Sequence, residues 1–509
     1  MASADKTHLQ TRQPDSNIEF AGDYFLKYIH LRNHAGKGIK TSVGESLKGE
    51  NININVVEFN IYESIFSSSV TGSAIIADTQ NLIGNLPIQG TERICFKLSV
   101  LGDTHPENTI DCSEATGHPM HIYKLTNKQQ LNDHTQSYTL HFASREFVRN
   151  LRTRVSKSFS GKMDEAVNSI FADPDYLDSR KVLHKQPTRN QDKVCIPNLT
   201  PFDAIGLLAK RSLPEKTEGA GYLFYETTKG FHFRSWESLC VDEVGQPKDP
   251  IQKFRYVQVP VDRLGHEVLK DGEPLDSVIE GYMNVENYKF LNNFHDVAAN
   301  TALGTYGHRV ITHNIFDKSY RADDFNYHNT FYKTKHTDKN PAVTDSPVDY
   351  DVLEGAAGYN KGVSDYPESR VTVQATTQYA HGEDTGNYGI DVSKDGALEG
   401  QRISQINQIH SGTRLQMTIK GQSWLQPGDL IQFDVQSVER RDAAARLDPL
   451  YSGRYIITHI RHRVAVDEYR QVIECVKDGV VSSVGGSPNK PYTEIAGEQS
   501  PHKTPRDIG

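Results

Sequence analysis

The chain has 509 residues, of which 36% are hydrophobic and 24% are charged, a balance typical of globular proteins. Its formal net charge of −9 at pH 7 disfavours non-specific binding to nucleic acid. A chain of this length is expected to form several domains, each with its own core.

Cysteine usage and the chain's start bear on where the protein is made. The five cysteines are an odd number without a CxxC spacing, so we expect reduced thiols in a protein made in the cytosol. No apolar run approaches the length of about 18 residues that a transmembrane helix needs. Residues 1–18 lack the apolar segment of a signal peptide and are interpreted as a polar arm.

Residues 19–145 are rich in short alternating segments and are predicted to form a first small β-barrel. Apolar residues alternate up to Val56, and the alternation resumes from Val57 in the opposite phase. A phase change inside a strand predicts a β-bulge. Further alternating strands separated by turn signals follow, which is typical of a barrel or sandwich.

Residues 146–277 are predicted to form a mixed α/β domain. Thr200 before Pro201 predicts the N-cap and first position of a helix. A hairpin over 221–235 is expected to turn at Gly230, which can adopt a positive φ. Helical spacing places five apolar residues on one face of an earlier helix, namely Met163, Ala166, Val167, Ile170 and Phe171.

Residues 278–320 and 411–480 are predicted to form a second small β-barrel. The polar stretch 321–410 between them is interpreted as an insertion, with a thin core over 321–397. Residues 481–509 are expected to be a disordered tail. The predicted fold class is therefore α+β, mainly β, with two similar small β-barrels, an inserted mixed α/β domain and a long polar insertion.

The two predicted barrels share an order of segments. The first contains "SAIIAD", a Gly/Pro loop, "ICFKLSV" and then a hairpin over 121–144. The second contains "RLQMTIKG", a Gly/Pro loop, "LIQFDV" and then a hairpin over 453–478. This order predicts an internal duplication, and duplicated barrels without reactive residues indicate architecture rather than chemistry.

Further segments carry a family resemblance over roughly residues 50–480. They are "YESIFSSSVTGSAIIADTQNLIGNLPIQG", "SREFVRNL", "PNLTPFDAIGLLAKRS", "GYLFYETTKGFHFRSWESL", "YGHRVITHNIFDKSY" and "DPLYSGRYIITHIRH". In this order they resemble the central baseplate hub protein of contractile-tailed bacteriophages. That family is similar to the N-terminal hub part of type VI secretion spike proteins.

The resemblance implies a structural protein, not an enzyme, without cofactor or bound metal. It implies a homotrimer whose two tube-like barrels per chain form a pseudo-sixfold ring joining the hexameric tail tube to the trimeric central spike. The implied partners are the spike and tube proteins, with tape measure and baseplate wedge proteins as further candidates. DNA would only pass through the lumen, and no membrane is involved.

The implied location is the virion tail baseplate, after assembly in the host bacterial cytoplasm. Two alternatives stay open at this point. One is a hub or spike component of a related contractile injection or secretion system. The other is a hub that also degrades the cell wall.

Two Gly/Pro loops, 84–90 and 424–429, occupy equivalent places in the predicted repeat. An exposed apolar tip on a stiff loop is covered either by a neighbouring molecule or by its own barrel. The candidate contacts with the tube or a neighbouring subunit are Leu86, Ile88, Trp424 and Leu425.

Few residues suggest chemistry. Residues 34–42 only superficially resemble a phosphate-binding loop, because the required G-K-[ST] is absent. His459 and His462 are three apart on a predicted strand, so they are expected to be solvated on opposite faces rather than to bind one metal ion. Glu215 and Glu218 could form an acid–base pair for glycoside cleavage, but no aromatic platform is nearby and a solvated loop is expected.

Overall fold

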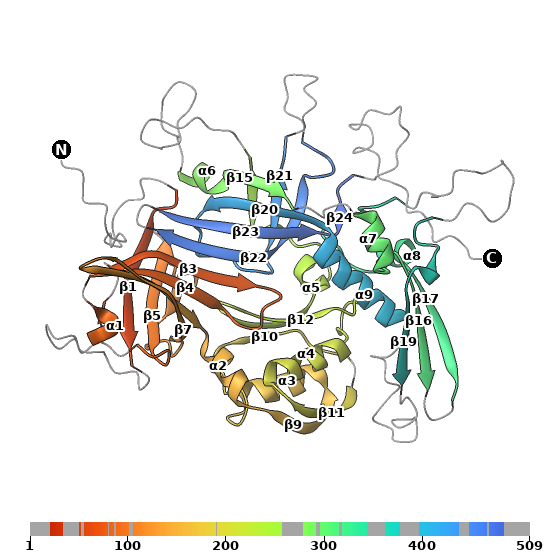
Figure 1. The fold of residues 1–509 in the computed structure, drawn as a ribbon. Helices are drawn as coiled ribbons and strands as arrows, with labels where there is room; N and C mark the ends of the chain where they lie inside the picture. Colours follow the sequence, from red (N-terminus) through yellow and green to blue (C-terminus); the bar gives the residue numbers. More distant parts are fainter. Residues whose placement is uncertain are drawn as a thin grey trace.

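The structure is a computed structural model that describes residues 21–33, 50–51, 55–79, 81–85, 88–100, 105–189, 191–256, 278–291, 296–314, 318–344, 362–376, 396–436, 447–465 and 468–482. Among these residues, no helix is both long and apolar enough to cross a membrane. Strands dominate the molecule, and helices cluster below and to one side of the largest sheet (Figure 1).

Fourteen of the described strands belong to one sheet that draws on both ends of the chain. From the first half it takes β1 (Tyr24–Arg32), β2 (Glu50–Asn51), β3 (Val56–Ser64), β4 (Thr71–Asp78), β5 (Arg93–Val100), β6 (Ile110–Cys112), β7 (Met120–Asn132) and β8 (Thr135–Ala143). From the second half it takes β14 (Gln252–Arg255), β15 (Val285–Phe290), β20 (Thr413–Lys420), β21 (Leu430–Asp434), β22 (Gly453–Ala465) and β23 (Tyr469–Lys477).

The predicted duplication is confirmed by the strand pairing. In the first half β4 pairs with β8, β8 with β7, and β7 with β5. In the second half β20 pairs with β23, β23 with β22, and β22 with β21. The pairs β3–β4 and β1–β5 likewise correspond to β15–β20 and β14–β21, although the last pair is parallel and β1–β5 is antiparallel. The two halves therefore share one connectivity.

The irregularities of the ladders repeat as well. Opposite β4, strand β3 has a bulge between Val56 and Glu58, where the sequence pattern predicts one. Opposite β20, strand β15 has its bulge at the corresponding place, between Val285 and Asn287. Strands β7 and β22 each have a bulge as well. In β7 it lies immediately beyond the residues that pair with β5, and in β22 it lies immediately beyond the residues that pair with β21. Because each bulge marks one position, the bulges align the two halves residue by residue.

The predicted fold class, α+β and mainly β, is confirmed, but the ladders of the described residues close neither half into a barrel. The reason lies in the long strand β22, whose first part pairs with β21 and whose last part pairs with β3. The pairing of β22 with β3 occupies the edge of β3 that would have to pair with β1 to close the first half into a barrel. In the second half a single bridge between Arg255 and Asn284 spans the gap between β14 and β15.

Each half buries one face of the sheet in its own apolar core. In the first half the aromatic rings of Phe59, Phe96 and Phe142 contact one another. In the second half Met417 and Tyr455 belong to a separate core. The helices α1 (Leu82–Asn85) and α6 (Val278–Met283), and the 3-10 turn η2 (Pro106–Asn108), lie in connections between the strands of these halves.

The middle of the chain has its own core and lies below the large sheet in Figure 1. The five apolar residues expected on one helix face are all buried in α3, and Thr200 accepts a hydrogen bond from Asp203 N (3.3 Å) at the start of α4. Gly230 turns the hairpin with φ 142°. These predictions are confirmed within α2 (Arg145–Arg152), β9 (Val155–Lys162), α3 (Met163–Ala172), β10 (Leu183–Lys185), β11 (Gln191–Leu199), α4 (Pro201–Arg211), β12 (Tyr222–Thr227), β13 (Gly230–Ser235) and α5 (Glu237–Cys240).

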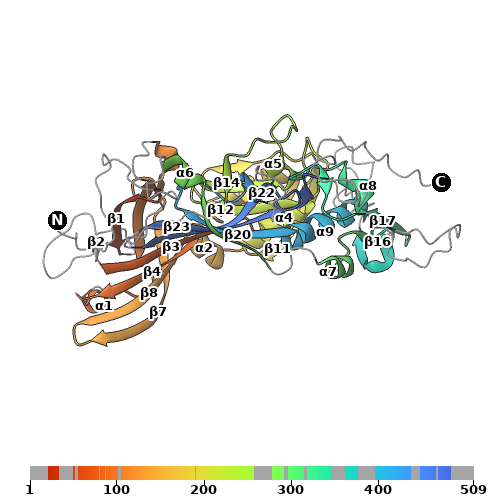
Figure 2. The ribbon, with the colours of Figure 1, turned by 90° about the horizontal axis from the view of Figure 1, so that it is seen from above.

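The boundary of the predicted insertion differs from expectation, whereas its core is small, in line with the thin core expected. Strand β16, assigned from the sequence to the second barrel, pairs instead with β17 and β19 in a separate three-stranded sheet (Figures 1 and 2). Phe325, Tyr327 and Phe331 also belong to a small core of their own. The elements are α7 (Val297–Ala302), β16 (Gly307–Asn314), β17 (Tyr320–Asn326), α8 (Tyr327–Phe331), β18 (Asn340–Pro341), η3 (Pro367–Ser369), β19 (Val371–Thr376), α9 (Gly396–Ser411) and β24 (Gly479–Val480).

Gly72 in β4 is expected to tolerate no side chain. A Cβ at this position would lie 2.2 Å from Cε2 of Phe142 and 2.6 Å from the carbonyl oxygen of Asn60. Gly72→Ala should lower the free energy of unfolding by about 1–3 kcal/mol, because a packed core must shift. The control Gly206→Ala, where a Cβ would meet nothing within 4 Å, should raise it by about 0.5–1 kcal/mol. Equal effects of the two changes in chemical denaturation would contradict this expectation.

Candidate functional site at the junction of the two halves

The halves meet through one antiparallel ladder among the described residues, between β3 and β22. It runs from the pair Ser64–His459 to the pair Glu58–Ala465. Figure 2 shows the strands of both halves continuing side by side across this junction. Because a slip of one residue would exchange the buried and exposed faces, the ladder fixes the position of one half against the other.

A buried hydrogen-bond network holds this ladder on its core side. Nε2 of His462 lies 2.8 Å from Oε1 of Glu63, and both side chains have no exposed surface. Nδ1 of His462 lies 2.6 Å from the hydroxyl of Tyr469. The second oxygen of Glu63 accepts a hydrogen bond from Thr228 N (2.9 Å), in the turn between β12 and β13. The network therefore joins both halves and the middle region.

The opposite face of the junction carries paired charges. Glu58 on β3 contacts both Arg461 (3.1 Å) and Arg463 (2.8 Å) on β22. Burial raises the pKa of Glu58, but the hydrogen bonds from Asn60 and Arg463 outweigh it, so the pKa lies below its usual value. These contacts place fixed carboxylate–guanidinium pairs across the strands that join the halves.

The expectation of two solvated histidines is wrong for His462, which is fully buried, whereas His459 on the other face is partly exposed. The opposite orientation of the two side chains is confirmed. The sequence carried a signal for the burial, because His462 shares the phase of Ile460 and Val464, which are both buried. Glu63 similarly follows the phase of the buried residues at 59 and 61, yet its pairing with a residue about 400 positions away has no local signal.

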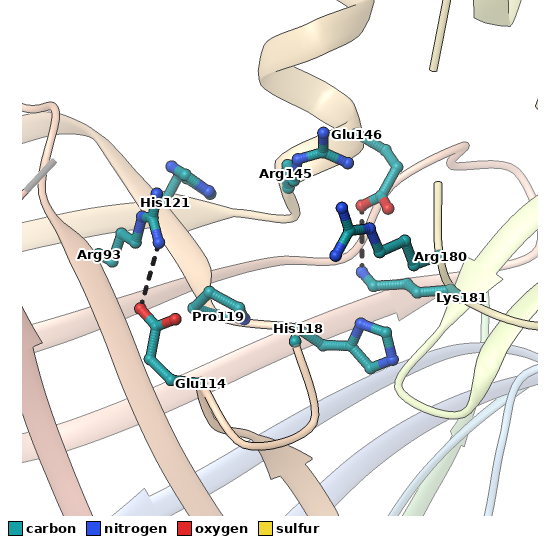
Figure 3. Close-up of a pocket in the computed structure, with 10 residues that line it drawn as sticks. Arg93, Glu114, His118, Pro119, His121, Arg145, Glu146, Arg180 and Lys181 are labelled. Carbon is teal, nitrogen blue, oxygen red and sulfur yellow. Dashed lines mark hydrogen bonds and ion pairs between the residues drawn. The ribbon is translucent and has the colours of Figure 1, made fainter. Parts of the chain in front are cut away.

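A cavity of about 350 Å³ lies between the first half and the middle region (Figure 3). Nη1 of Arg93 lies 3.3 Å from Oε1 of Glu114, and Nη2 of Arg145 lies 2.6 Å from Oδ2 of Asp178. The sequence analysis did not identify this cavity, because its walls come from segments far apart in the chain. They are formed by Arg93, Glu114, Gly117, His118, Pro119, His121, Arg145, Glu146, Arg180 and Lys181.

Two residues of the cavity wall, Glu146 and Lys181, belong to a buried ionic triad. Lys181 contacts Glu146 (3.2 Å) and also Glu226. Burial raises the pKa of Glu226, whereas for Glu146 the Lys181 charge and the hydrogen bond from Ser179 overcome burial and lower the pKa. Glu226 also accepts a hydrogen bond from Val70 N (2.8 Å), so the triad ties the first half to the middle region.

The predicted contact residues are placed differently from one another. Leu86 lies outside the described residues, and Ile88 is half-buried against the first core. Leu425 is only 1% exposed and belongs to the second core, so its own chain covers it and it offers no free apolar tip. Trp424 packs against both cores, and its Nε1 donates to Oε1 of Gln252 (3.1 Å). The second loop is therefore covered by its own chain, with Leu425 in the second core and Trp424 against both cores.

Glu215 and Glu218 are both exposed in the loop before β12. Residues 34–42 lie outside the described residues. Within the part of the chain that the structure describes, no group of three or more His, Cys, Asp or Glu side chains is arranged to hold a metal ion.

Glu63→Gln is expected to destabilise the junction. The amide keeps one acceptor oxygen, so either His462 or Thr228 N loses its partner in a buried site. The free energy of unfolding should fall by about 1–3 kcal/mol. The same change at Glu474, whose side chain is 25% exposed beside Arg414, should cost about 0–1 kcal/mol. Urea denaturation of both variants provides the measurement, and a larger loss for Glu474→Gln would refute the expectation.

Leu425→Ala is expected to lower the free energy of unfolding by about 2–5 kcal/mol, because it leaves a cavity in the second core. The matched change Ile88→Ala should cost less, since that side chain is half-buried. Thermal and chemical denaturation of the two variants make the comparison. If Leu425→Ala were neutral, Leu425 would not be a core residue.

Comparisons with known proteins find solved structures of low similarity to this chain. No protein-family model and no curated protein matches it. A tail protein from Neisseria meningitidis MC58 is 8% identical, with a TM-score of 0.45, covering 90% of this chain and 98% of that one. The 43 kDa tail protein of prophage MuSo2 from Shewanella oneidensis is 10% identical, with a TM-score of 0.43, covering 89% and 99%.

A third solved structure is an E. coli protein described as a component of the type VI secretion system. It is 10% identical, with a TM-score of 0.35, covering 83% of this chain and 73% of that one. The three structures are thus described as two tail proteins, one of them from a prophage, and one component of the type VI secretion system.

Proposed function

We propose that this protein is the structural hub of a contractile-tail baseplate, a homotrimer that forms a pseudo-sixfold ring between a hexameric tail tube and a trimeric central spike. One observation carries the proposal: two halves with the same connectivity and the same bulges are fused through a ladder between β3 and β22. Two equivalent halves in each of three copies give a ring of six similar units. The number three follows from the resemblance to hub proteins.

The junction inside the chain supplies a template for the contact between copies. By the alignment of the halves, β7 corresponds to β22 and β15 corresponds to β3. Among the described strands, none pairs with the outer edge of β15, and beyond its short contact with β5 strand β7 pairs only with β8. If β7 of one copy pairs with β15 of the next, the strands from β15 to β7 repeat around the ring. Closure of the ring then removes the open edges.

The proposed role is mechanical. The ring would be assembled in the host cytoplasm, carried in the virion tail baseplate, and contacted by the spike and tube proteins on its two sides. We propose no catalysis, because the buried ionic groups at the junction are held by one another and join structural parts.

The first test is the oligomeric state. Light scattering should give three times the chain mass of 57.1 kDa, for the protein alone or with its spike. Averaged end views in electron microscopy should show six similar densities around a central opening. A stable monomer under both conditions would refute the hub.

The second test addresses the strand edges. Inside the chain Arg461 pairs with Tyr62, and the corresponding positions are Thr126 and Leu291. In a Cys195→Ser background, which removes the exposed native thiol, Thr126→Cys with Leu291→Cys should cross-link copies into covalent trimers upon oxidation.

The matched control for this test combines Thr126→Cys with Phe290→Cys instead of Leu291→Cys. A shift by one residue points the second thiol to the other face of the sheet, so cross-linking should be lost. A trimer that forms without any cross-link between positions 126 and 291 would refute the pairing of β7 with β15 but would not contradict the proposed hub function.

A further inference from the structure

A second and larger cavity, of about 780 Å³, lies in the middle region of the chain. Its walls come from the end of β10, from β13 and α5, and from the loops that precede β12 and follow α5. The volume lies within the range of roughly 300–1,000 Å³ that is usual for small-molecule sites. Apolar side chains such as Pro187 and Val244 alternate with charged ones in these walls, so the cavity can hold an organic molecule that carries a charged group.

Arg234 on β13 faces this cavity without a counterion. Its guanidinium forms no hydrogen bond or ion pair with the described residues. Nε is buried, but the two Nη nitrogens are not, so these donors are open to a molecule in the cavity. The charge of Arg234 acts on its neighbours, because it is the next cause after burial that lowers the pKa of His184 and the pKa of His232, the latter to about 3.

Lys248 adds a second cation to the same cavity. Its Nζ donates to the carbonyl oxygen of Ser238 (2.6 Å), which is an uncharged partner. Burial lowers the pKa of Lys248, and the charge of Arg234 lowers it further by more than any single opposing effect. Lys185, by contrast, is engaged by Asp164 (2.9 Å). Two cations that repel each other, each without a carboxylate partner, favour an anion beside them.

The carboxylates of the cavity do not neutralise this pair of cations. In the described part of the chain none of them forms an ion pair with Arg234 or Lys248. Asp242 instead accepts two backbone hydrogen bonds from its own loop, at 2.8 and 2.9 Å. The three carboxylates occupy exposed positions and belong to Glu215, Asp242 and Glu243.

We propose that this cavity binds a small organic monocarboxylate. Arg234 and Lys248 hold the carboxylate, and the apolar remainder lies against Pro187 and Val244. A guanidinium presents a planar fork of donors that matches the two oxygens of a carboxylate. The exposed carboxylates repel a second negative charge, so the site favours a monoanion over a dianion. This binding is independent of the hub function.

The ligand class is tested by titration calorimetry of the full chain at pH 7.5 and low salt. Sodium benzoate should bind several-fold more tightly than benzamide, its uncharged analogue, and more tightly than sodium sulfate. Equal binding of benzoate and benzamide, or no binding of benzoate, would overturn the proposal. Tighter binding of sulfate than of benzoate would overturn the assignment to a monoanion.

The position of the site is tested by removing its cation. Arg234→Gln should weaken benzoate binding about tenfold, through loss of a charged hydrogen-bond donor. The matched control Arg189→Gln removes an exposed arginine of the same region that does not line the cavity, and it should bind benzoate like the unchanged protein. Equal weakening by both variants would mean a general effect of surface charge and would overturn the site.

A further variant has the opposite expected sign and leaves β13 unchanged. Glu215→Gln with Glu243→Gln removes two exposed carboxylates from the cavity, so the affinity for benzoate should rise several-fold at low salt, where charges act over longer distances. Thermal unfolding of each variant shows that it is folded before the titration. Unchanged or weaker benzoate binding by the folded double variant would overturn this cavity as the binding site.

Discussion

The ladder between β3 and β22 is the constraint on which the rest of the structure depends. It joins the strands of two halves with separate cores into one continuous sheet. A histidine and a glutamate whose side chains have no exposed surface stabilise it. Polar groups buried in this way are costly unless every donor and acceptor is satisfied, and here Glu63 binds both His462 and the backbone of a hairpin in the middle region. The same interaction therefore sets the relative position of three parts of the chain.

The second consequence concerns symmetry. In an exact repeat, the junction between halves of one chain and the junction between chains would be alike. The halves here share their connectivity and their bulges, but β14 is parallel to β21 where β1 is antiparallel to β5. The difference between the two halves therefore lies outside the strands that form the junction. The long strand β22 shows how the junction works, because one strand completes its own half with its first part and reaches the next half with its last part.

Local features of the fold were predictable from sequence, and distant contacts were not. The change of phase at Val56 predicts its bulge, and Thr200 and Gly230 predict a cap and a turn, because each depends only on neighbouring residues. The pairing of β3 with β22, the cavity walls and the burial of Leu425 depend on segments hundreds of residues apart. Strand β16 shows the same limit, since alternation marks a strand but does not say which sheet receives it.

The paired charges on the outer face of the junction bear on what that face can do. Glu58 binds both Arg461 and Arg463, and Arg414 binds Glu474 at 3.0 Å. A polyanion is held by cations that exchange its counterions, and a guanidinium already paired with a carboxylate has less to offer. Such a face is wettable and, with three arginines against two glutamates, carries only one net positive charge where these contacts lie. In the proposed ring it would suit a wall past which nucleic acid moves without being retained, whereas unpaired arginines in the same positions would bind it.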